Sequence, residues 1–506
     1  MLRPLASLVS VVVLGVGSSS LLPEARAFSL LGPFQEWMTK SLSYQDGQAI
    51  GGPMLLGEGY RWNVPVVTYA FDASFTNHFG ARGVQEVQAA MAILNALPPA
   101  STMDLDAFPL NPIRTNPEAM QDGVLDLKSA AMSLVLEQLG LAQPQRYTFT
   151  VRQVQTTPEG TNILVINRNF DPRALAPSTA VNGEAFTHSE TSYEGASGLR
   201  IFDSIELSVD PLAVTRTAVA EGFPFSGNFF TGLSRDDAGG LRYLLNPNRW
   251  VVEGLLSDVS PASPGDPAFV TTATRGGVDK ITFQRVPPEA VSAGQPPLAT
   301  FAYQDRYLTN QTVAASAPVR REVRRPDMLF TAEYTGIPMV TRTGTTNWMN
   351  NAGLNGGFPG SGGPGVVQSP VRINLNPVRH SILNFSGAYP APDFAVIMGA
   401  GWGSYDDSTN AVVVYPALSS SGGAVGNVTT VVHVLIFKMR SLSQAEGSAV
   451  LEFTGPLGAP FQLQTSTDLQ TWELALPLQN LGGHFNYGDG PVSGAPQRFF
   501  RVVPQP

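Results

Sequence analysis

The pattern of hydrophobic residues predicts both strands and helices in the first half of the chain. Residues 60–71 (YRWNVPVVTYAF) are rich in β-branched and aromatic side chains, which predicts a strand. In residues 83–97 the apolar side chains recur at helical spacing, which predicts an amphipathic helix that ends before Pro98. Residues 147–154 and 161–170 are β-prone runs separated by a Pro-Glu-Gly turn, and they predict a hairpin.

Two further helices are predicted from apolar runs with recognisable ends. In residues 124–144 (VLDLKSAAMSLVLEQLGLAQP) an apolar run is followed by a Gly-Leu pair and then by Pro144. This order is usual at a helix C-terminus. Residues 232–245 (GLSRDDAGGLRYLL) contain Ser234, a good N-cap, followed by two aspartates in the first turn. We expect the first of these helices to pack on the strand at residues 60–71.

The second half of the chain has the pattern of strands and loops. Pro and Gly clusters separate short β-prone runs, and helical patterns fade after residue 250. Residues 353–365 are a low-complexity Gly/Pro stretch, which predicts a long loop. Residues 171–200 are also predicted to be a loop. The predicted strands are residues 280–286, 328–334, 370–375, 394–399, 412–415 and 428–439.

Length and composition set the expected architecture. Of the 506 residues only 14% are charged, while 50 are Gly and 41 are Pro, which favours strands and turns over long charged helices. We predict a multidomain protein with an α+β domain over residues 28–250 followed by mostly β, sandwich-like domains. These are a β-rich region over residues 251–440 and a C-terminal β-module over residues 441–506. The net charge of −9 gives no reason to expect a nucleic-acid partner.

The first 27 residues have the layout of a secretory signal peptide. A basic start at Arg3 precedes an apolar stretch over residues 5–22, and Ala25-Arg-Ala27 has the A-x-A form of a cleavage site. Glycine and serine residues interrupt the apolar stretch and keep it shorter than a membrane span. We therefore expect cleavage after Ala27 and export to the periplasm, the exterior or the cell surface. We expect no transmembrane span in the mature chain.

A compact motif lies near the end of the chain. Residues 461–472 read FQLQTSTDLQTW, and residues 498–502 read RFFRV. The pair resembles a short C-terminal β-module of secreted bacterial proteins, which has a Y/F-x-L-x-x-S-x-D-L-x-x-W hairpin and a closing R-F-F/Y-R-V strand. The resemblance implies an accessory sandwich on an exported protein, with Trp472 in its small core and no chemistry of its own.

The N-terminal region resembles the metzincin metallopeptidases of the matrixin kind. The strand at residues 60–71 and the helix after it are similar to the way those domains begin. The helix at residues 232–245 is similar to the way they end, with the D-x-x-G-hydrophobic-x-x-hydrophobic places taken by Asp237, Gly240, Leu241 and Leu244.

The zinc motif of that family has no counterpart in the helix at residues 124–144. When H-E-x-x-H-x-x-G-x-x-H is laid over it, Gly140 matches the glycine and Leu134 takes the general-base position. A zinc site needs three or four His, thiolate or carboxylate ligands. This helix offers one carboxylate, because the ligand positions hold Ser133, Glu137 and Gln143.

Other candidate functional residues are few. The chain has no cysteine, which excludes disulfides, iron–sulfur clusters and cysteine nucleophiles. His188, Glu190 and Glu194 form an acidic–histidine cluster, which is either a candidate metal or acid–base site or part of a solvated polar loop. Trp348 and Trp402 lie in Gly/Asn-rich stretches, where a ring either stacks on a sugar or polymer or packs on the edge of a sandwich.

The densest charge run of the chain is basic. It contains Arg320, Arg321, Arg324 and Arg325, interrupted by two valines. The alternation predicts an exposed edge strand whose charges prevent aggregation. A site for an anionic polymer is the alternative.

Two functional hypotheses of different class remain. The first is an exported non-catalytic structural or adhesive surface protein without a cofactor, whose partner is an extracellular polymer or a cell-surface component. The second is a secreted hydrolase, either metal-dependent and peptidase-like or glycan-active, with a site that the sequence does not reveal. The sequence contains no local histidine pair, no cysteine and no G-x-S-x-G nucleophile elbow, and this favours the first hypothesis.

Overall fold

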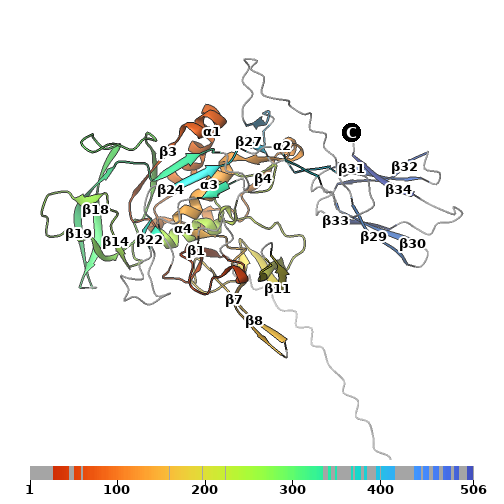
Figure 1. The fold of residues 1–506 in the computed structure, drawn as a ribbon, viewed down its shortest axis with the longest axis horizontal. Coiled ribbons are helices and arrows are strands. Elements are labelled where there is room, and N and C mark those ends of the chain that lie inside the picture. Colours follow the sequence, from red (N-terminus) through yellow and green to blue (C-terminus); the bar gives the residue numbers. More distant parts are fainter. Residues whose placement is uncertain are drawn as a thin grey trace, which may run out of the picture.

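The computed structural model describes residues 27–44, 51–58, 61–158, 160–195, 198–222, 224–310 and 312–333 without a break, and shorter stretches between residues 340 and 504. The described part is mostly β, with few helices and several separate sheets (Figure 1). No helix within it is long and apolar enough to cross a membrane. The loop predicted at residues 353–365 and most of the strand predicted at residues 428–439 lie outside the described residues.

The central sheet takes strands from both sides of residue 250. β3, from the strand predicted at residues 60–71, lies between β17 and β20 and runs parallel to both. β24 continues the parallel set, and β21 closes it in the antiparallel direction. Backbone hydrogen bonds therefore join residues 28–250 to residues 251–440 within one sheet. In sheet order the strands are β17 (Thr282–Arg285), β3 (Val66–Phe71), β20 (Met328–Thr331), β24 (Val371–Leu375) and β21 (Val340–Arg342).

Helix α1 (Ala73–Asn95) packs on this sheet and begins earlier than the pattern at residues 83–97 predicts. The side chain of Asp72 accepts a hydrogen bond from the Phe75 amide and caps the N-terminus. Gly80 has a φ of 62° and kinks the helix. The kink puts the turns before Gly80 out of phase with the turns after it. The hydrophobic periodicity of the sequence therefore predicts only the second part of the helix.

Helix α3 (Leu127–Leu139) is the core of the first half of the chain. The Asp126 side chain caps its N-terminus, and Gly140, with a φ of 106°, ends it in the left-handed region as predicted. Eleven of its thirteen residues are buried. Its main neighbours are α1, the 3-10 helix η4 (Val219–Glu221), β6, β13 and β27. The stretch predicted to pack on it, residues 60–71, contacts it through Trp62, whose indole N–H donates to the Gln138 carbonyl. The strands around it are β5 (Val124–Asp126), β6 (Leu141–Ala142), β13 (Asn228–Phe230) and β27 (Gly401–Ser404).

Helix α4 (Arg235–Leu245) begins at the predicted cap. Ser234 and Asp237 form a reciprocal capping box, in which each side chain bonds to the other residue's backbone amide. The remaining α-helix within the described residues is the short α2 (Pro117–Gln121). Its cap is Asn116, whose side chain accepts a hydrogen bond from the Ala119 amide.

A second, antiparallel sheet lies beside the central one, at the left of Figure 1. β19 pairs on one side with β18 and on the other with β15, so the predicted exposed edge strand at the arginine run is instead an inner strand. Arg320 is exposed, whereas Arg321 is buried. In sheet order the strands are β14 (Val251–Gly254), β16 (Thr272–Arg275), β18 (Ala299–Thr309), β19 (Val313–Val323) and β15 (Val259–Pro261).

Buried ion pairs connect the two sheets. The guanidinium of Arg321 on β19 pairs with Asp327, which precedes β20, and donates to the Val66 carbonyl at the start of β3. Asp327 also accepts hydrogen bonds from the amide and the hydroxyl of Thr68. A second buried pair, Arg61–Glu253 at 2.8 Å, ties the segment before β3 to β14. Removing one partner of such a pair leaves a buried charge uncompensated, which is strongly destabilising.

Two hairpins lie in the lower part of Figure 1, where β7, β8 and β11 are close together. The hairpin of β7 (Thr150–Thr157) and β8 (Gly160–Ile166) confirms the prediction at residues 147–170. The loop predicted at residues 171–200 was wrong, because β11 (Glu184–Glu194) pairs from Phe186 to Glu194 with β12 (Arg200–Ser208). β10 (Ala180–Val181) completes this sheet. The polar residues of β11 concealed the strand, since few of them carry a β-prone apolar signal.

The remaining strands form small sheets. The C-terminal hairpin predicted at residues 461–472 is present as β31 (Pro460–Ser466) and β32 (Glu473–Gln479), and the predicted closing strand is β34 (Phe499–Pro504), which pairs with β31. The others are β1 (Phe28–Gly32), β2 (Gly52–Met54), β4 (Ile113–Thr115), β9 (Asn169–Phe170), β22 (Trp348–Met349), β23 (Val366–Val367), β25 (Ser381–Asn384), β26 (Ala395–Met398), β28 (Val413–Val414), β29 (Lys438–Ala445), β30 (Ser448–Thr454) and β33 (His484–Gly488).

Candidate functional site

Helix α3, which resembles a zinc-binding helix, is packed in the core. At the ligand and general-base positions, Ser133 and Leu134 are buried in the core rather than open to a cleft. Glu137 and Gln143 are half-buried. Among the described residues no group of three or more His, Cys, Asp or Glu side chains has the arrangement to hold a metal ion. The polar positions of α3 therefore do not form a chemical centre in this part of the chain.

The acidic–histidine cluster is only partly assembled. His188 and Glu190 are neighbours on one face of β11, with Nε2 and Oε1 3.2 Å apart, and the His188 ring stacks on Phe149. Glu194 lies at the far end of the strand, roughly 13 Å beyond Glu190 at the rise of a β-strand. The structure therefore brings together two of the three predicted residues, in a strand rather than in the expected loop.

The two candidate stacking tryptophans have different outcomes. Trp402 on β27 is only 1% exposed, and its indole N–H donates to the Asn376 carbonyl over 2.8 Å. Its ring faces are covered by the core, so the prediction that it stacks on a ligand was wrong. The prediction for Trp348 rests on a side chain outside the described residues.

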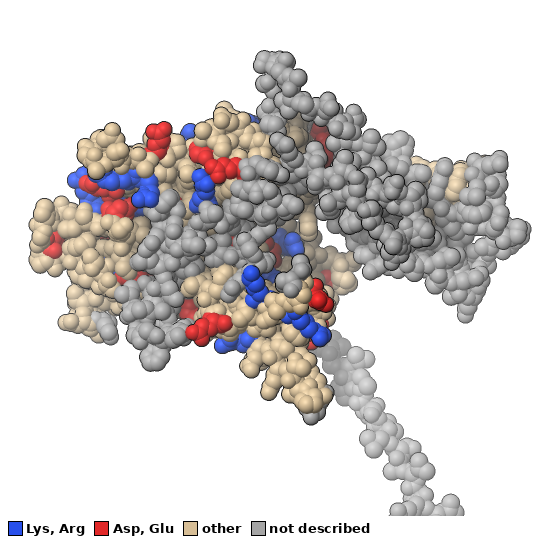
Figure 2. All heavy atoms as spheres, viewed as in Figure 1, with Lys and Arg blue, Asp and Glu red and all other residues tan. Residues whose placement is uncertain are grey.

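The arginine run does not form a purely basic surface. Arg320 pairs with Glu322 over 2.9 Å, and Arg321 is buried. Arg324 donates to the Ser292 and Gln295 carbonyls and so holds a neighbouring loop. Figure 2 shows Lys/Arg and Asp/Glu atoms intermingled at this end of the molecule. Mixed charges of this kind do not give the single-sign field that would concentrate an anionic polymer.

The β11–β12 hairpin has two faces of different character. Successive side chains of a strand point to opposite faces, so Ile205 and Leu207 share one face, and Tyr193 joins them through its pairing with Ile201. These side chains are exposed, and the chain continues beyond β12 into further exposed apolar residues, of which Leu212 is 87% exposed. We call this surface the hairpin face: Tyr193, Ile205, Leu207, Val209, Leu212 and Val214.

The hairpin is fixed to the body by one arginine. Arg146, in the turn after α3, places Nη2 2.6 Å from Asp203 Oδ1 and Nη1 3.2 Å from Glu206 Oε1. The Ser43 hydroxyl donates to the other oxygen of Asp203 over 3.0 Å. Asp203 and Glu206 are both on β12, so the guanidinium pairs with two carboxylates of the same strand.

The segment that follows the hairpin is fixed to the same turn. Glu221 accepts a hydrogen bond from the Gln145 amide over 2.8 Å, and the Gln145 side chain accepts one from the Arg216 amide over 2.9 Å. Burial raises the pKa of Glu221 to about 8, and it also raises the pKa of Glu206. A buried carboxyl resists ionisation because the low-dielectric surroundings disfavour its charge.

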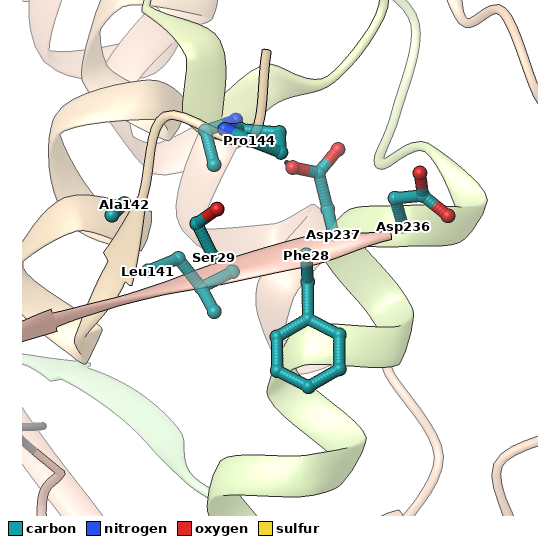
Figure 3. A pocket seen from close by; sticks show the side chains of 8 residues that line it. Phe28, Ser29, Leu141, Ala142, Pro144, Asp236 and Asp237 are labelled. Carbon is teal, nitrogen blue, oxygen red and sulfur yellow. Dashed lines mark hydrogen bonds between the residues drawn. The ribbon is translucent and has the colours of Figure 1, made fainter. Parts of the chain in front are cut away.

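A second pair of carboxylates lies at the start of α4 (Figure 3). Asp236 accepts hydrogen bonds from the amides of Ala27 and Asn182, over 2.8 and 2.6 Å. Asp237 accepts from the amides of Val219 and Ala220. These carboxylates line a small hollow beside Phe28, Leu141 and Pro144, and they hold backbone segments from far along the chain. The sequence predicted their place in the helix but not these distant partners.

No protein-family model, curated protein or solved structure matches this chain. Within the described residues, the side chains of the hairpin face are exposed apolar groups. The prediction of a loop over residues 171–200 missed the β11 side of this hairpin. The alternation of Ile201, Ile205 and Leu207 with polar residues predicts a strand over residues 201–209, and the structure confirms it as β12.

Proposed function

We propose that this chain is an exported, non-catalytic surface protein that adheres to an extracellular polymer or a cell-surface component through the hairpin face. The exposed apolar hairpin face is the observation that carries the proposal. We further propose that residues 1–27 are a signal peptide. In the same proposal, an α+β domain, a sandwich-like β region and a C-terminal accessory module follow one another in the mature chain.

The composition of the hairpin face supports a contact role. Scattered exposed apolar residues are ordinary, but a contiguous set marks an interaction surface more often. Three members of the set, Ile205, Leu207 and Val209, follow one another on one side of β12 and its extension. Tyr193, which pairs with Ile201 across the two strands, adds an exposed ring that suits the apolar faces of sugar rings in a polymer.

The packing of α3 supports the absence of peptidase chemistry. A metal-dependent peptidase needs its ligands and its general base beside a substrate cleft. In this helix Ser133 and Leu134 are surrounded by the core, and Trp62 donates its indole N–H to a backbone carbonyl of the same helix. The region that resembles a catalytic helix therefore has the environment of a structural one.

Binding to isolated cell envelopes and to a panel of insoluble polysaccharides tests the proposal. The wild-type chain from residue 28 onward should co-sediment with at least one of them. The double change Leu207→Glu and Leu212→Glu should weaken binding by about tenfold or more, because charges on the hairpin face would have to be desolvated in the contact. Val313→Glu, at a similarly exposed valine on the β18–β19 hairpin, is the matched control and should bind like the wild type.

Two results would refute the proposal. One is equal binding by the double variant and the wild type. The other is hydrolysis of a peptide or glycan substrate by the purified protein that is lost when residues of the described part are changed. Recovery of the protein only inside cells, with residues 1–27 still attached, would refute the export part.

A further inference from the structure

Exposed apolar side chains gather in one part of the described chain. Of its thirteen large hydrophobic residues with high exposure, eight lie between residues 193 and 225. Six of the eight form the hairpin face, and the other two are Leu199, in the turn between β11 and β12, and Phe225. Clustered exposed apolar side chains, unlike scattered ones, mark a surface that contacts a partner.

The charged side chains of the hairpin are sorted between its two faces. Successive side chains of a strand point to opposite faces, so the glutamates of β11 lie on the face opposite to Tyr193. On the face of Tyr193, the charged residue of the two strands is Asp203, which is paired with Arg146. The apolar side chains therefore share their face with a compensated carboxylate and with uncharged residues. The glutamates of the other face are Glu184, Glu190 and Glu194.

The chain leaves β12 through an ordered turn. The Asp210 carboxylate accepts a hydrogen bond from the Leu212 amide over 2.9 Å, and the Asp210 carbonyl accepts one from the Ala213 amide over 3.1 Å. The Ser208 hydroxyl donates to the same carbonyl over 2.6 Å. These bonds hold Leu212 outward, with 87% of its surface exposed. A turn that is already ordered loses little conformational entropy when its side chain enters a contact.

A cation follows this turn and is held against an exposed ring. The Arg216 guanidinium lies over the Phe225 ring, 5.0 Å from its centroid, and Phe225 is 61% exposed. Arg216 has a φ of 58°, in the left-handed region that residues with side chains rarely adopt, and its amide donates to the Gln145 side chain over 2.9 Å. Backbone strain of this kind persists only where the surroundings hold it, and it is frequent at functional positions.

Arg216 is the charge that this segment presents to a partner. Arg216 and Glu221 are the only charged residues between positions 211 and 225. The Glu221 carboxylate accepts the Gln145 amide, so it is directed to the turn after α3. The carboxylate of Asp210, just before this segment, is used within its own turn. Protruding apolar side chains beside a guanidinium match the surface of a bilayer, in which phosphate groups lie above an apolar interior.

We propose that Leu212, Val214, Arg216 and Phe225 form a lipid-docking tip, which seats the hairpin on a bilayer with anionic headgroups. The inference rests on the proposed function, because it names the cell-surface component that the hairpin face contacts. The apolar side chains enter the boundary between headgroups and acyl chains, and the guanidinium pairs with a lipid phosphate. The glutamates of β11, on the opposite face, then point away from the anionic surface.

Co-sedimentation with vesicles tests the lipid-docking tip. The chain from residue 28 onward should bind vesicles of mixed phosphatidylcholine and phosphatidylglycerol, and it should bind them more weakly as the salt concentration rises. Arg216→Gln should weaken this binding by about fivefold, the effect of one basic residue near an anionic surface. Arg306→Gln, at an exposed arginine of β18, is the matched control and should bind like the wild type.

The apolar part of the tip has its own test, which the lack of native cysteine makes possible. An environment-sensitive fluorophore on Leu212→Cys should emit at shorter wavelength when mixed vesicles are added, because the side chain leaves water. The same label on Val313→Cys, exposed on the β18–β19 hairpin at the left of Figure 1, should show no change. Phe225→Ser should weaken vesicle binding by about tenfold, since it removes a large apolar side chain from the contact.

The lipid-docking tip is overturned if mixed vesicles do not bind, or if Arg216→Gln and Phe225→Ser bind them like the wild type. Binding to cell envelopes or to a polysaccharide without binding to vesicles would also overturn it and would leave the proposed function standing. Vesicle binding that needs Arg216 and Phe225 but is unchanged in Leu207→Glu would support the tip and refute the wider hairpin face. An emission shift at Leu212→Cys that appears with protein concentration before vesicles are added would identify a second copy of the chain as the occupant and overturn the tip.

Discussion

Helix α3 and the β11–β12 hairpin are held by different forces. The helix has eleven of its thirteen residues buried and is surrounded by apolar neighbours on several sides. The hairpin exposes the apolar side chains of the hairpin face to solvent and is held to the body by Arg146 through Asp203 and Glu206. Apolar packing depends little on pH, whereas ion pairs change with every proton gained or lost. The helix is therefore held mostly by contacts that depend little on pH, and the hairpin partly by contacts that depend on it.

The difference also separates stability from function. Buried apolar contacts determine whether the chain folds, and exposed contacts determine what the folded chain touches. In this chain the region that resembles an enzyme's catalytic helix serves the first purpose. The proposed function assigns the second purpose to the β11–β12 hairpin, whose apolar side chains are exposed.

Truncating a leucine in each region gives the largest expected contrast. Leu134 in α3 has no exposed surface, so Leu134→Ala should lower the free energy of unfolding by about 2–5 kcal/mol. Leu207 on the hairpin face is 46% exposed, so Leu207→Ala should change it by only about 0.5 kcal/mol. Urea unfolding followed by circular dichroism measures both. Equal losses would show that the hairpin face is packed against something in solution.

Sequence patterns predicted where helices and strands begin and end better than they predicted which of them lie side by side. The cap at Ser234 and the left-handed end at Gly140 were predictable, because both depend on a few adjacent residues. The pairing of β3 with β17 was not, because it joins residues more than two hundred positions apart and leaves no local pattern. Polar strands such as β11 were missed for a related reason, since their stability comes from the partner strand.

The candidate site shows the same limit. The arginine run predicted charge at the surface, yet Arg321 is buried, because its partners Asp258 and Asp327 come from separate loops. The carboxylates that pair with Arg146, those of Asp203 and Glu206, lie about sixty positions further along the chain. No spacing rule connects such residues, so these pairs could not be predicted from the sequence.

Asp126 sharpens the comparison, because it places a pH-sensitive group inside the packed region. Burial raises its pKa to about 6, although its bonds to Ser129 oppose the shift. Its raised pKa means that stability is greatest below the unfolded value near 4 and falls as the pH rises through 6.

Asp126→Asn keeps the N-cap acceptor without the charge. Between pH 4 and 7 it should gain up to about 3 kcal/mol of unfolding free energy relative to wild type, the equivalent of roughly two pKa units. Urea unfolding at several pH values measures the difference. A constant difference across this range would show that Asp126 stays ionised in the folded state.

Gln138 offers the smallest and most discriminating test of how α3 is held. It is the second-to-last residue of the helix and has no exposed surface, and neither polar atom of its side chain has a hydrogen-bond partner among the described residues. An unsatisfied buried amide costs about 1–3 kcal/mol, so Gln138→Leu should stabilise the protein by an amount within that range. Gln155→Leu, at an exposed position of β7, is the control and should have little effect. A loss of stability in Gln138→Leu would mean that the amide is satisfied in solution by a buried water, because only a bonded amide is worth more than the leucine that replaces it. The stability of the helix would then depend on a polar contact at Gln138 as well as on apolar packing. The helix and the hairpin would differ only in how much each depends on polar contacts.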